Sequence, residues 1–443
     1  MKGSHELGRV LGNGFAMAAV LGTIVGLGIL ATPGEIAAVF PKPLHFMGVW
    51  LAGGIFVTLS TAVAAELVGV TPRSGGYYVL VRESLGPFPG FVIGWTDWLS
   101  FCASIALKAV VVIEYLGHVI PGTENYQLPL AFLVTTFFAA LQLRGIAFGA
   151  KVQQAAAAGM ALIIIGLSLA LAFSEKVIVS DGALPVLNQP ELADYGLVVA
   201  AVVFTYDGWL SASYFGGEIK GGGRMVALAC LKAVLLVFAL YMVLMGALAW
   251  TVPLELLADS ELALATALEI ALSPAAAMTV TLAAILILLA HQNLHYMGAP
   301  RILFALSEDG FGTRRATRVH RHGNPIIAVA LTWLVAVALM LSGGFNYLLN
   351  LAALLFVILY VALFVGFILM RVRSPGIERP YRAWGHPVST VVCLLGWIAI
   401  SLFMAVSSPE SALSALVMIA VAVPVYFAMT SYRNRMAREA SGT

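Results

Sequence analysis

The stretch Gly22-Thr23-Ile24-Val25-Gly26-Leu27-Gly28 lies in the middle of the apolar segment 10–40 and decides how that segment folds. Three glycines in seven residues weaken a helix, since each glycine costs about 1 kcal/mol relative to alanine. The segment around them is long enough to cross a lipid bilayer, which takes roughly 20 apolar residues in a helix. We therefore predict a membrane-spanning helix that is interrupted at its centre.

A second apolar segment, 195–217, carries the central sequence Phe204-Thr205-Tyr206-Asp207-Gly208-Trp209. An aspartate at mid-membrane depth is costly and usually functional. The two interrupted segments are the first and the sixth of the predicted spans, so they enter the membrane in opposite directions. This pattern predicts two inverted five-helix repeats whose discontinuous helices form a binding site at the midplane. The alternative is that the glycines only permit close helix packing.

The composition is that of a membrane protein throughout. Of 443 residues, 61% are hydrophobic and 10% are charged, whereas a soluble domain has about 25% charged residues. The three cysteines show no metal-ligand spacing, and we expect neither a metal nor a cofactor. We place spans at 10–40, 45–68, 89–117, 128–143, 152–174, 195–217, 225–251, 274–305, 325–342, 345–370, 388–407 and 411–431.

The basic residues indicate the topology. With the N-terminus inside, Lys42 and Lys176 lie outside, and Lys108 and Lys232 lie within spans. The remaining 20 of the 24 basic residues, Arg301 and Arg321 among them, then fall in cytoplasmic segments. The positive-inside rule predicts that both ends are cytoplasmic in a multi-pass protein of a bacterial or archaeal cytoplasmic (inner) membrane. Because these residues are scattered over many short loops, we expect no nucleic-acid partner.

Further motifs follow in order along the chain. They are Pro72-Arg73-Ser74-Gly75-Gly76-Tyr77-Tyr78, Arg82-Glu83-Ser84-Leu85-Gly86, Arg301-Ile302-Leu303-Phe304-Ala305-Leu306-Ser307-Glu308-Asp309-Gly310 and Arg379-Pro380-Tyr381-Arg382-Ala383-Trp384-Gly385-His386-Pro387. Together with the two interrupted segments, this ordered set resembles the amino acid–polyamine–organocation (APC) superfamily. Within it, the chain is similar to bacterial amino acid permeases related to the L-type amino acid transporters.

The resemblance implies an all-α, LeuT-like fold with 12 transmembrane helices, of which helices 1 and 6 are discontinuous. Residues 1–174 would hold the N-terminal tail and helices 1–5, and residues 195–370 would hold helices 6–10. Helices 11 and 12 would occupy 388–432, followed by a cytoplasmic tail at 433–443. The resemblance further implies sodium-independent transport or exchange of amino acids or related amines by alternating access.

The break in the first helix suits an amino acid. Backbone N–H groups freed at the start of its second half, with the half-helix dipole, favour a carboxylate. Carbonyls freed near Val203 and Phe204 suit an ammonium group. Phe204 is a candidate aromatic gate, and Trp209 is a second one unless it only packs. The predicted substrate-binding residues, which family analogy supports, are Thr23, Ile24, Gly26, Leu27, Gly28, Val203, Phe204, Asp207 and Trp209.

Two of these residues bear on substrate choice. Leu27 stands where similar transporters more often have serine or alanine, and this bulkier, less polar residue indicates small or apolar neutral amino acids. Asp207 has two readings, as a partner for a cationic amine or as an acceptor that orders the broken helix. The first reading leaves open an alternative function as a transporter or antiporter of polyamines or other organic amines.

The coupling mechanism departs from the family pattern. Many relatives carry a lysine in helix 5 at the position of Met160, which cannot carry a proton. Residues 290–295 in helix 8 supply no pair of hydroxyls for a sodium site. Lys108, within the third span, is a candidate proton carrier or built-in cation, unless it extends to the interface or pairs with a carboxylate. His291 and His295 are further coupling candidates, although ordinary hydrogen bonding is the simpler role.

Other function classes lack their motifs. The sequence has no His-Glu-x-x-His motif, no Gly-x-Ser-x-Gly elbow and no P-loop, so we expect neither an enzyme nor an ATP-driven pump. The predicted partners are a small-molecule substrate and the lipid bilayer, and the predicted state is a monomer or weak homo-oligomer. The predicted function is secondary active amino acid transport, as a proton-coupled symporter or an exchanger.

Overall fold

The computed structural model describes residues 7–179, 184–185, 187, 189–258, 260–320, 322–343, 345–407 and 409–441. Lys2, Arg321 and the last two residues of the predicted tail, 442–443, lie outside these ranges. Every regular element in the described part of the chain is a helix, and two isolated β-bridges are its only extended pairings. The predicted all-α class is therefore confirmed.

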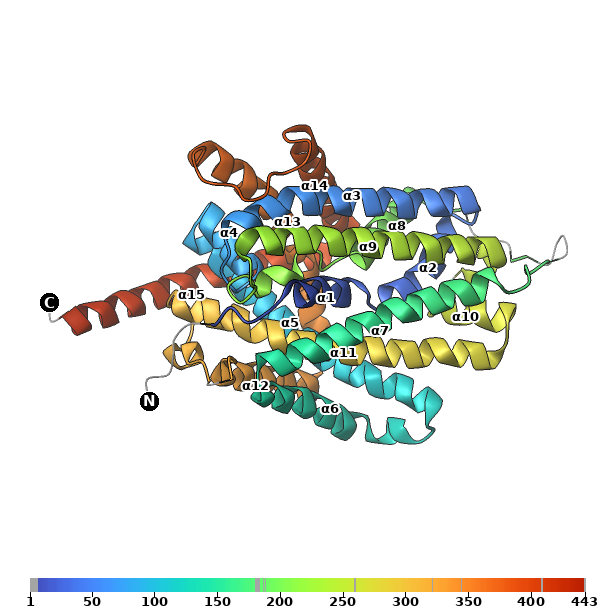
Figure 1. Ribbon diagram of the computed structural model, residues 1–443, viewed down its shortest axis with the longest axis horizontal. Coiled ribbons are helices and arrows are strands. Elements are labelled where there is room, and N and C mark those ends of the chain that lie inside the picture. Colours follow the sequence, from blue (N-terminus) through green and yellow to red (C-terminus); the bar gives the residue numbers. More distant parts are fainter. Residues whose placement is uncertain are drawn as a thin grey trace.

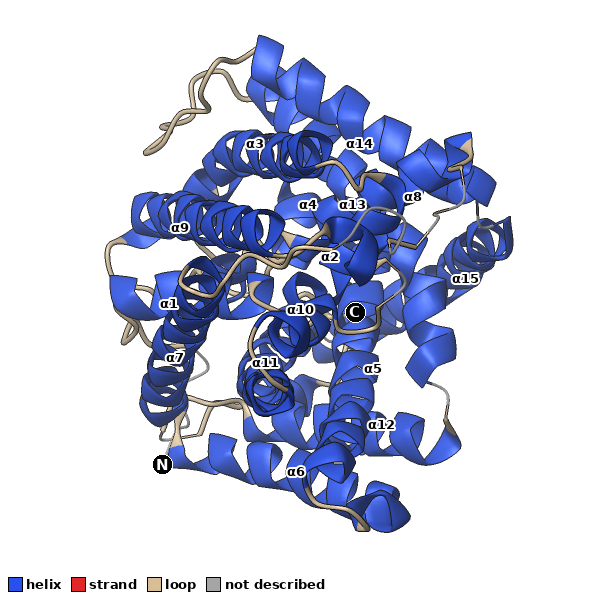
Figure 2. Ribbon diagram, turned by 90° about the vertical axis from the view of Figure 1, so that its right-hand side faces the viewer, coloured by secondary structure: helices blue, strands red, loops and turns tan. Residues whose placement is uncertain are grey.

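Long helices pack side by side in a bundle, and the described chain begins and ends at the same end of it (Figure 1). Figure 2 looks along the bundle and shows the helices surrounding α10, α11 and α2. Eight helices among the described residues are long and apolar enough to span a membrane, or nine when the bent pair α1 and α2 is counted as one. The protein is thus a multi-pass membrane protein.

The α-helices are α1 (Asn13–Ile24), α2 (Gly28–Val39), α3 (Pro43–Val70), α4 (Tyr77–Leu85), α5 (Pro87–Val119), α6 (Gln127–Leu141), α7 (Ile146–Ala172), α8 (Leu192–Thr205), α9 (Gly222–Thr251), α10 (Ala263–Ala271), α11 (Pro274–Glu308), α12 (Ile326–Ser342), α13 (Phe345–Arg373), α14 (Val388–Ser407) and α15 (Pro409–Ser441). The 3-10 turns are η1 (Thr123–Tyr126), η2 (Gln142–Arg144), η3 (Ser211–Tyr214), η4 (Leu254–Leu257) and η5 (Arg314–Thr317).

The first span is broken within the glycine-rich stretch. Helix α1 ends at Ile24, helix α2 begins at Gly28, and the two axes differ by 40°. The backbone of Val25 is extended, with a ψ angle of 92°. The interruption expected from the three glycines therefore lies at residues 25–27.

The second segment expected to be interrupted, 195–217, is also broken in the structure. Helix α8 ends at Thr205, and the rest of the segment forms only the turn η3. Gly208 has φ +99°, and a Cβ there would lie 2.4 Å from Cγ2 of Thr23. Three residues after the helix ends, the chain thus turns at a residue that must be glycine, because α1 passes against it.

A buried ion pair holds the bundle at the end where the chain begins. The guanidinium of Arg301 on α11 donates to Glu218 at 2.9 and 3.0 Å, and to Oδ1 of Asn324 at 2.9 Å. The backbone N–H of Leu11 donates to the carbonyl of Glu218 at 2.9 Å. The side chains of Arg301 and Glu218 are 0% and 1% exposed. The sequence prediction places Arg301 among the charges of cytoplasmic segments, but its side chain is buried within the bundle.

Among the described glycines, Gly223 of α9 lies closest to the backbone of a neighbouring helix, α3. An alanine Cβ at Gly223 would lie 1.9 Å from the carbonyl oxygen of Gly69 and 3.0 Å from its Cα. Small residues that let backbones approach are a common basis of helix association in membranes. The obstacle here is backbone, which cannot rotate away as a side chain can.

We expect Gly223→Ala to destabilise the protein, because α9 would have to move away from α3. Overpacking of this kind costs typically about 1–3 kcal/mol, and a backbone obstacle favours the upper end. The measurement is the thermal unfolding midpoint of the purified protein in detergent. Gly159→Ala on α7 is the matched control, since its Cβ would meet nothing within 4 Å. Equal midpoints for the two variants would contradict the tight α3–α9 contact.

Candidate functional site

A cavity of about 270 Å³ lies between the two interrupted segments. The break between α1 and α2 and the end of α8 form part of its wall, and α4, α5, η3 and α11 complete it. Nine of the residues singled out from the sequence line this cavity. They are Thr23, Ile24, Gly26, Gly28, Lys108, Phe204, Asp207, His291 and His295.

The carbonyls freed at the break of the first span have side-chain partners. The hydroxyl of Tyr241 on α9 donates to the carbonyl of Ile24 at 3.0 Å. Nε2 of His291 on α11 lies 3.1 Å from the carbonyl of Val25. A carbonyl only accepts, so His291 carries its proton on Nε2 and donates it there. The break is therefore held by two neighbouring helices.

Glycines at the break admit these neighbours. A Cβ at Gly26 would lie 3.3 Å from Cε1 of His291, and one at Gly28 would lie 3.0 Å from Oγ1 of Thr205. Oγ1 of Thr205 also donates to Oγ1 of Thr32 at 3.1 Å, which joins α8 to α2. The two interrupted segments thus pack directly on each other beside the cavity.

Asp207 is anchored by a helix far away in the sequence. The hydroxyl of Tyr360 on α13 donates to its carboxylate, and the hydroxyl of Tyr77 on α4 lies 3.5 Å from that of Tyr360. Asp207 and Tyr77 line the cavity, whereas Tyr360 stands behind them. The carboxylate therefore ties the interrupted segment to α13 while facing the cavity.

Lys108 lies at the cavity edge with an imidazole as its partner. Its Nζ is 3.3 Å from Nε2 of His295, and Nδ1 of His295 is 2.7 Å from the carbonyl of His291. Among the described residues, no carboxylate is within ion-pair distance of Lys108. The alternative that Lys108 pairs with a carboxylate is not what the structure shows.

Four predicted residues lie away from the cavity, and three of them are packed within the bundle. The side chain of Leu27 packs against a cluster that includes Ala106 and Leu288, so it does not narrow the cavity. Trp209 is fully buried and stacks on Tyr360 with ring centres 5.1 Å apart. Met160, at the family's helix-5 lysine position, is buried in α7 and is not among the lining residues.

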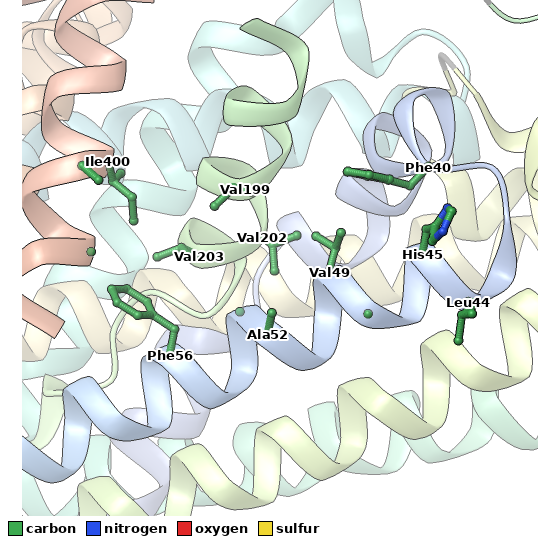
Figure 3. A pocket seen from close by; sticks show the side chains of 14 residues that line it. Phe40, Leu44, His45, Val49, Ala52, Phe56, Val199, Val202, Val203 and Ile400 are labelled. Atoms are coloured by element: carbon green, nitrogen blue, oxygen red, sulfur yellow. The ribbon is translucent and has the colours of Figure 1, made fainter. Parts of the chain in front are cut away.

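Val203 faces a different space. It lines a lateral pocket of about 600 Å³ between α3, α8 and α14, shown in Figure 3. Apolar side chains such as Phe40, Phe56 and Ile400 surround this pocket, and His45 is the polar side chain on its wall. The side chain of Val203 therefore points away from the cavity that Phe204, the next residue, lines.

Sequence reasoning missed several lining residues. Asp97, Ser100, Ser104 and Lys108 recur at three- and four-residue intervals on α5, and this spacing places them on one helix face. That polar stripe could have been found from the sequence. Asp97 lies just outside the lining and accepts from the hydroxyl of Tyr214 at 3.0 and 3.1 Å. The missed lining residues are Tyr77, Ser100, Phe101, Ser104, Thr205, Gly208, Ser211 and Tyr214.

The interrupted segments, the cavity between them and the apolar bundle are the architecture of a membrane permease. The chain belongs to the amino acid permease family, which matches it over residues 15–430.

Among curated proteins, the chain is 24% identical over 441 residues to the serine/threonine exchanger SteT of Bacillus subtilis, covering 96% of this chain and 98% of that one. It is 26% identical over 443 residues to the rat b(0,+)-type amino acid transporter 1, covering 95% and 88%. It is also 24% identical over 376 residues to a probable polyamine transporter of Arabidopsis thaliana, covering 81% and 72%. The match to the first two relatives extends over nearly the full length of this chain.

The contact between Asp207 and Tyr360 generates a prediction about stability. We expect Tyr360→Phe and Asp207→Ala each to lower the thermal unfolding midpoint, because a buried polar group loses a partner at a cost of about 1–3 kcal/mol. The double variant should lose less than the sum of the two single losses, since residues in one hydrogen bond are coupled. Tyr195→Phe, which removes an exposed hydroxyl on α8, is the control. Additive losses would mean that the two side chains act independently.

Proposed function

We propose that this protein is a sodium-independent secondary active transporter of amino acids, preferring small or apolar neutral ones, that works by alternating access as a proton-coupled symporter or an exchanger. The observation that carries this proposal is the central cavity between two interrupted segments, with the freed backbone of the first span on its wall. Discontinuous helices that meet at the midplane are typical of substrate sites in secondary transporters.

The proposed architecture has 12 spans in a LeuT-like arrangement. Residues 1–174 would form the N-terminal tail and first repeat, and 195–370 the inverted second repeat. Helices α14 and α15 would be the two appended spans of 388–432, followed by a cytoplasmic tail at 433–443. An even number of crossings agrees with a described chain that begins and ends at the same end of the bundle (Figure 1). We propose a bacterial or archaeal cytoplasmic membrane, with both ends cytoplasmic and a monomer or weak homo-oligomer.

The site would hold an amino acid mainly through backbone groups. The first N–H groups of a helix lack acceptors within it, so the start of α2 at Gly28 offers donors and a positive dipole end to a carboxylate. Residues Gly26 and Leu27 would contribute through their backbone, although the side chain of Leu27 points elsewhere. The ammonium group would face the end of α8 and Asp207. Phe204 lines the same wall and would cover the bound substrate.

The preference for small neutral substrates has two supports. The cavity of about 270 Å³ is smaller than the pockets that hold drug-sized ligands. The Bacillus subtilis relative bears the name of a serine/threonine exchanger, and serine and threonine are small neutral amino acids. The sequence argument from Leu27 carries less weight, because its side chain does not line the cavity.

Independence from sodium is supported by what occupies the break. A sodium ion would need freed carbonyl oxygens and hydroxyl ligands, but the carbonyl of Val25 already accepts the proton of His291. Met160 stands where similar transporters have a lysine in helix 5, so proton coupling in this chain would depend on other titratable groups.

Transport of polyamines or other organic amines is the second candidate. It is favoured by Asp207, which faces the cavity, and by polyamine transporters among the relatives. Two observations weigh against it. Asp207 is already engaged by Tyr360, and Lys108 in the same cavity would repel a polycation.

A ligand screen by thermal stability tests this proposal. At about 100 times its Kd, a ligand adds roughly 2.7 kcal/mol to the stability of the folded state. We expect L-serine and L-alanine to raise the unfolding midpoint, and their decarboxylated counterparts ethanolamine and ethylamine to leave it unchanged. Shifts with putrescine or the simple amines, and none with amino acids, would favour the amine transporter and make Asp207 the primary substrate contact.

A further inference from the structure

The contact between Lys108 and His295 has a defined direction. Nδ1 of His295 lies 2.7 Å from the carbonyl of His291, and a carbonyl only accepts, so the ring proton sits on Nδ1. In the neutral imidazole, Nε2 then presents a lone pair to Nζ of Lys108, 3.3 Å away. The lysine ammonium donates, and the neutral imidazole accepts.

This arrangement accommodates one exchangeable proton and not two. If His295 also carried a proton on Nε2 while Lys108 was an ammonium, two N–H groups would face each other and two like charges would stand in direct contact. With one proton, the pair is a charge-assisted hydrogen bond. Without it, the neutral amine can still donate an N–H to the imidazole. The pair can thus alternate between charges of +1 and 0 with its geometry retained.

The other titratable groups around Lys108 are few and mostly engaged. From α11 it faces His291 and His295, and across the cavity it faces Asp207, which accepts from Tyr360 of α13. Tyr77 of α4 and Tyr214 of η3 line the same cavity, and Tyr214 donates to Asp97.

Among the described residues, the remaining neighbours of α5 bring no charge close to Lys108. Helices α6 and α12 contain no acid, base or tyrosine. Two further elements pack on α5 near its ends. Glu124 of η1 lies beside Gly117, and Tyr426 of α15 packs on Phe91. A change in charge at Lys108 is therefore not balanced by a paired carboxylate.

The pair is connected to the break in the first span. The carbonyl that accepts from His295 belongs to His291. The two imidazole rings lie 6.0 Å apart, centre to centre. The ring of His291 in turn donates to the carbonyl of Val25. Val25 is the first residue of the break, where α1 and α2 change direction. A charge gained or lost at Lys108 and His295 thus acts on the residue that holds the break.

We propose that Lys108 and His295 together form the binding site of a cotransported proton, and that His291 relays its occupancy to the break between α1 and α2. This inference rests on the proposed amino acid transport. A proton from water in the cavity forms an N–H bond with the neutral amine of Lys108, and the same bond breaks when the proton leaves to water on the other side. The zwitterionic substrate has no net charge, so each symport cycle moves one positive charge.

The experiment uses the full-length protein in liposomes, with labelled L-serine as the probe. Counterflow at equal pH on both sides reports substrate exchange, which needs no net proton movement. Accumulation driven by an alkaline interior reports proton coupling, and one proton per substrate allows up to about tenfold accumulation for each pH unit. For the wild type, we expect both activities.

Two variants separate a transported proton from a fixed charge. In Lys108→Met, and also in Lys108→Arg, we expect accumulation to fall to a ratio of about 1, because methionine binds no proton and arginine does not release one. Counterflow should fall much less than accumulation. Lys232→Met is the control, since this lysine also lies in a span but is exposed on α9, and it should accumulate L-serine as the wild type does. Size-exclusion profiles establish which variants are folded, and Lys108→Arg retains the charge should the methionine variant fail to fold.

The outcomes are distinct. Accumulation at the wild-type level in either Lys108 variant would overturn the proposal, and so would loss of counterflow in a folded Lys108→Arg protein, which would make Lys108 a substrate contact. Wild-type counterflow without pH-driven accumulation would identify an exchanger, overturning the proton site while leaving the proposed transport intact. If the wild type shows no counterflow of L-serine and no thermal shift with any amino acid, the proposed function itself fails.

Discussion

Backbone groups freed inside a bilayer must find partners within the protein, because the hydrocarbon offers no water. That constraint governs the break between α1 and α2. The helix cannot simply stop at Ile24. Its last carbonyls are satisfied by the hydroxyl of Tyr241 from α9 and the imidazole of His291 from α11. The interrupted span is stable only because these two helices are placed beside it.

The positions of α9 and α11 depend in turn on contacts remote from the cavity. Helix α9 is fixed against α3 by the close approach of Gly223 to Gly69, and α11 is fixed by the buried pair of Arg301 and Glu218. Glu218 also belongs to the segment that follows η3, so the same ion pair fixes the second interrupted segment. The geometry of the cavity is therefore set largely at the end of the bundle where the chain begins.

Much of this arrangement was predictable from the sequence because it is local. Three glycines within seven residues indicated a break between Gly22 and Gly28, and an aspartate in an apolar segment indicated a functional position at Asp207. The direction of individual side chains was not predictable in the same way. Val203 and Phe204 are neighbours in the chain, yet they face a lateral pocket and the central cavity, respectively. Which of them faces the substrate depends on how α8 packs against α3 and α14.

Partners from distant helices were also beyond the reach of the sequence. Nothing near Asp207 indicated Tyr360, and nothing near Lys108 indicated His295, because each pair is formed by tertiary packing over more than a hundred residues. The polar stripe of α5 is the exception. The spacing of Asp97, Ser100, Ser104 and Lys108 puts them on one helix face. From this spacing, Ser100 and Ser104 could have been predicted to lie at the site.

Arg301 and Lys108 differ in a way that matters for transport. Arg301 is paired with a carboxylate, and a guanidinium does not lose its proton in proteins, so this charge is permanent and structural. Lys108 is paired with a neutral imidazole instead. A carboxylate in that place would hold the ammonium in its charged form, whereas an imidazole leaves the proton free to exchange with water in the cavity. The partner, more than the lysine itself, makes this position suitable for a charge that changes during a transport cycle.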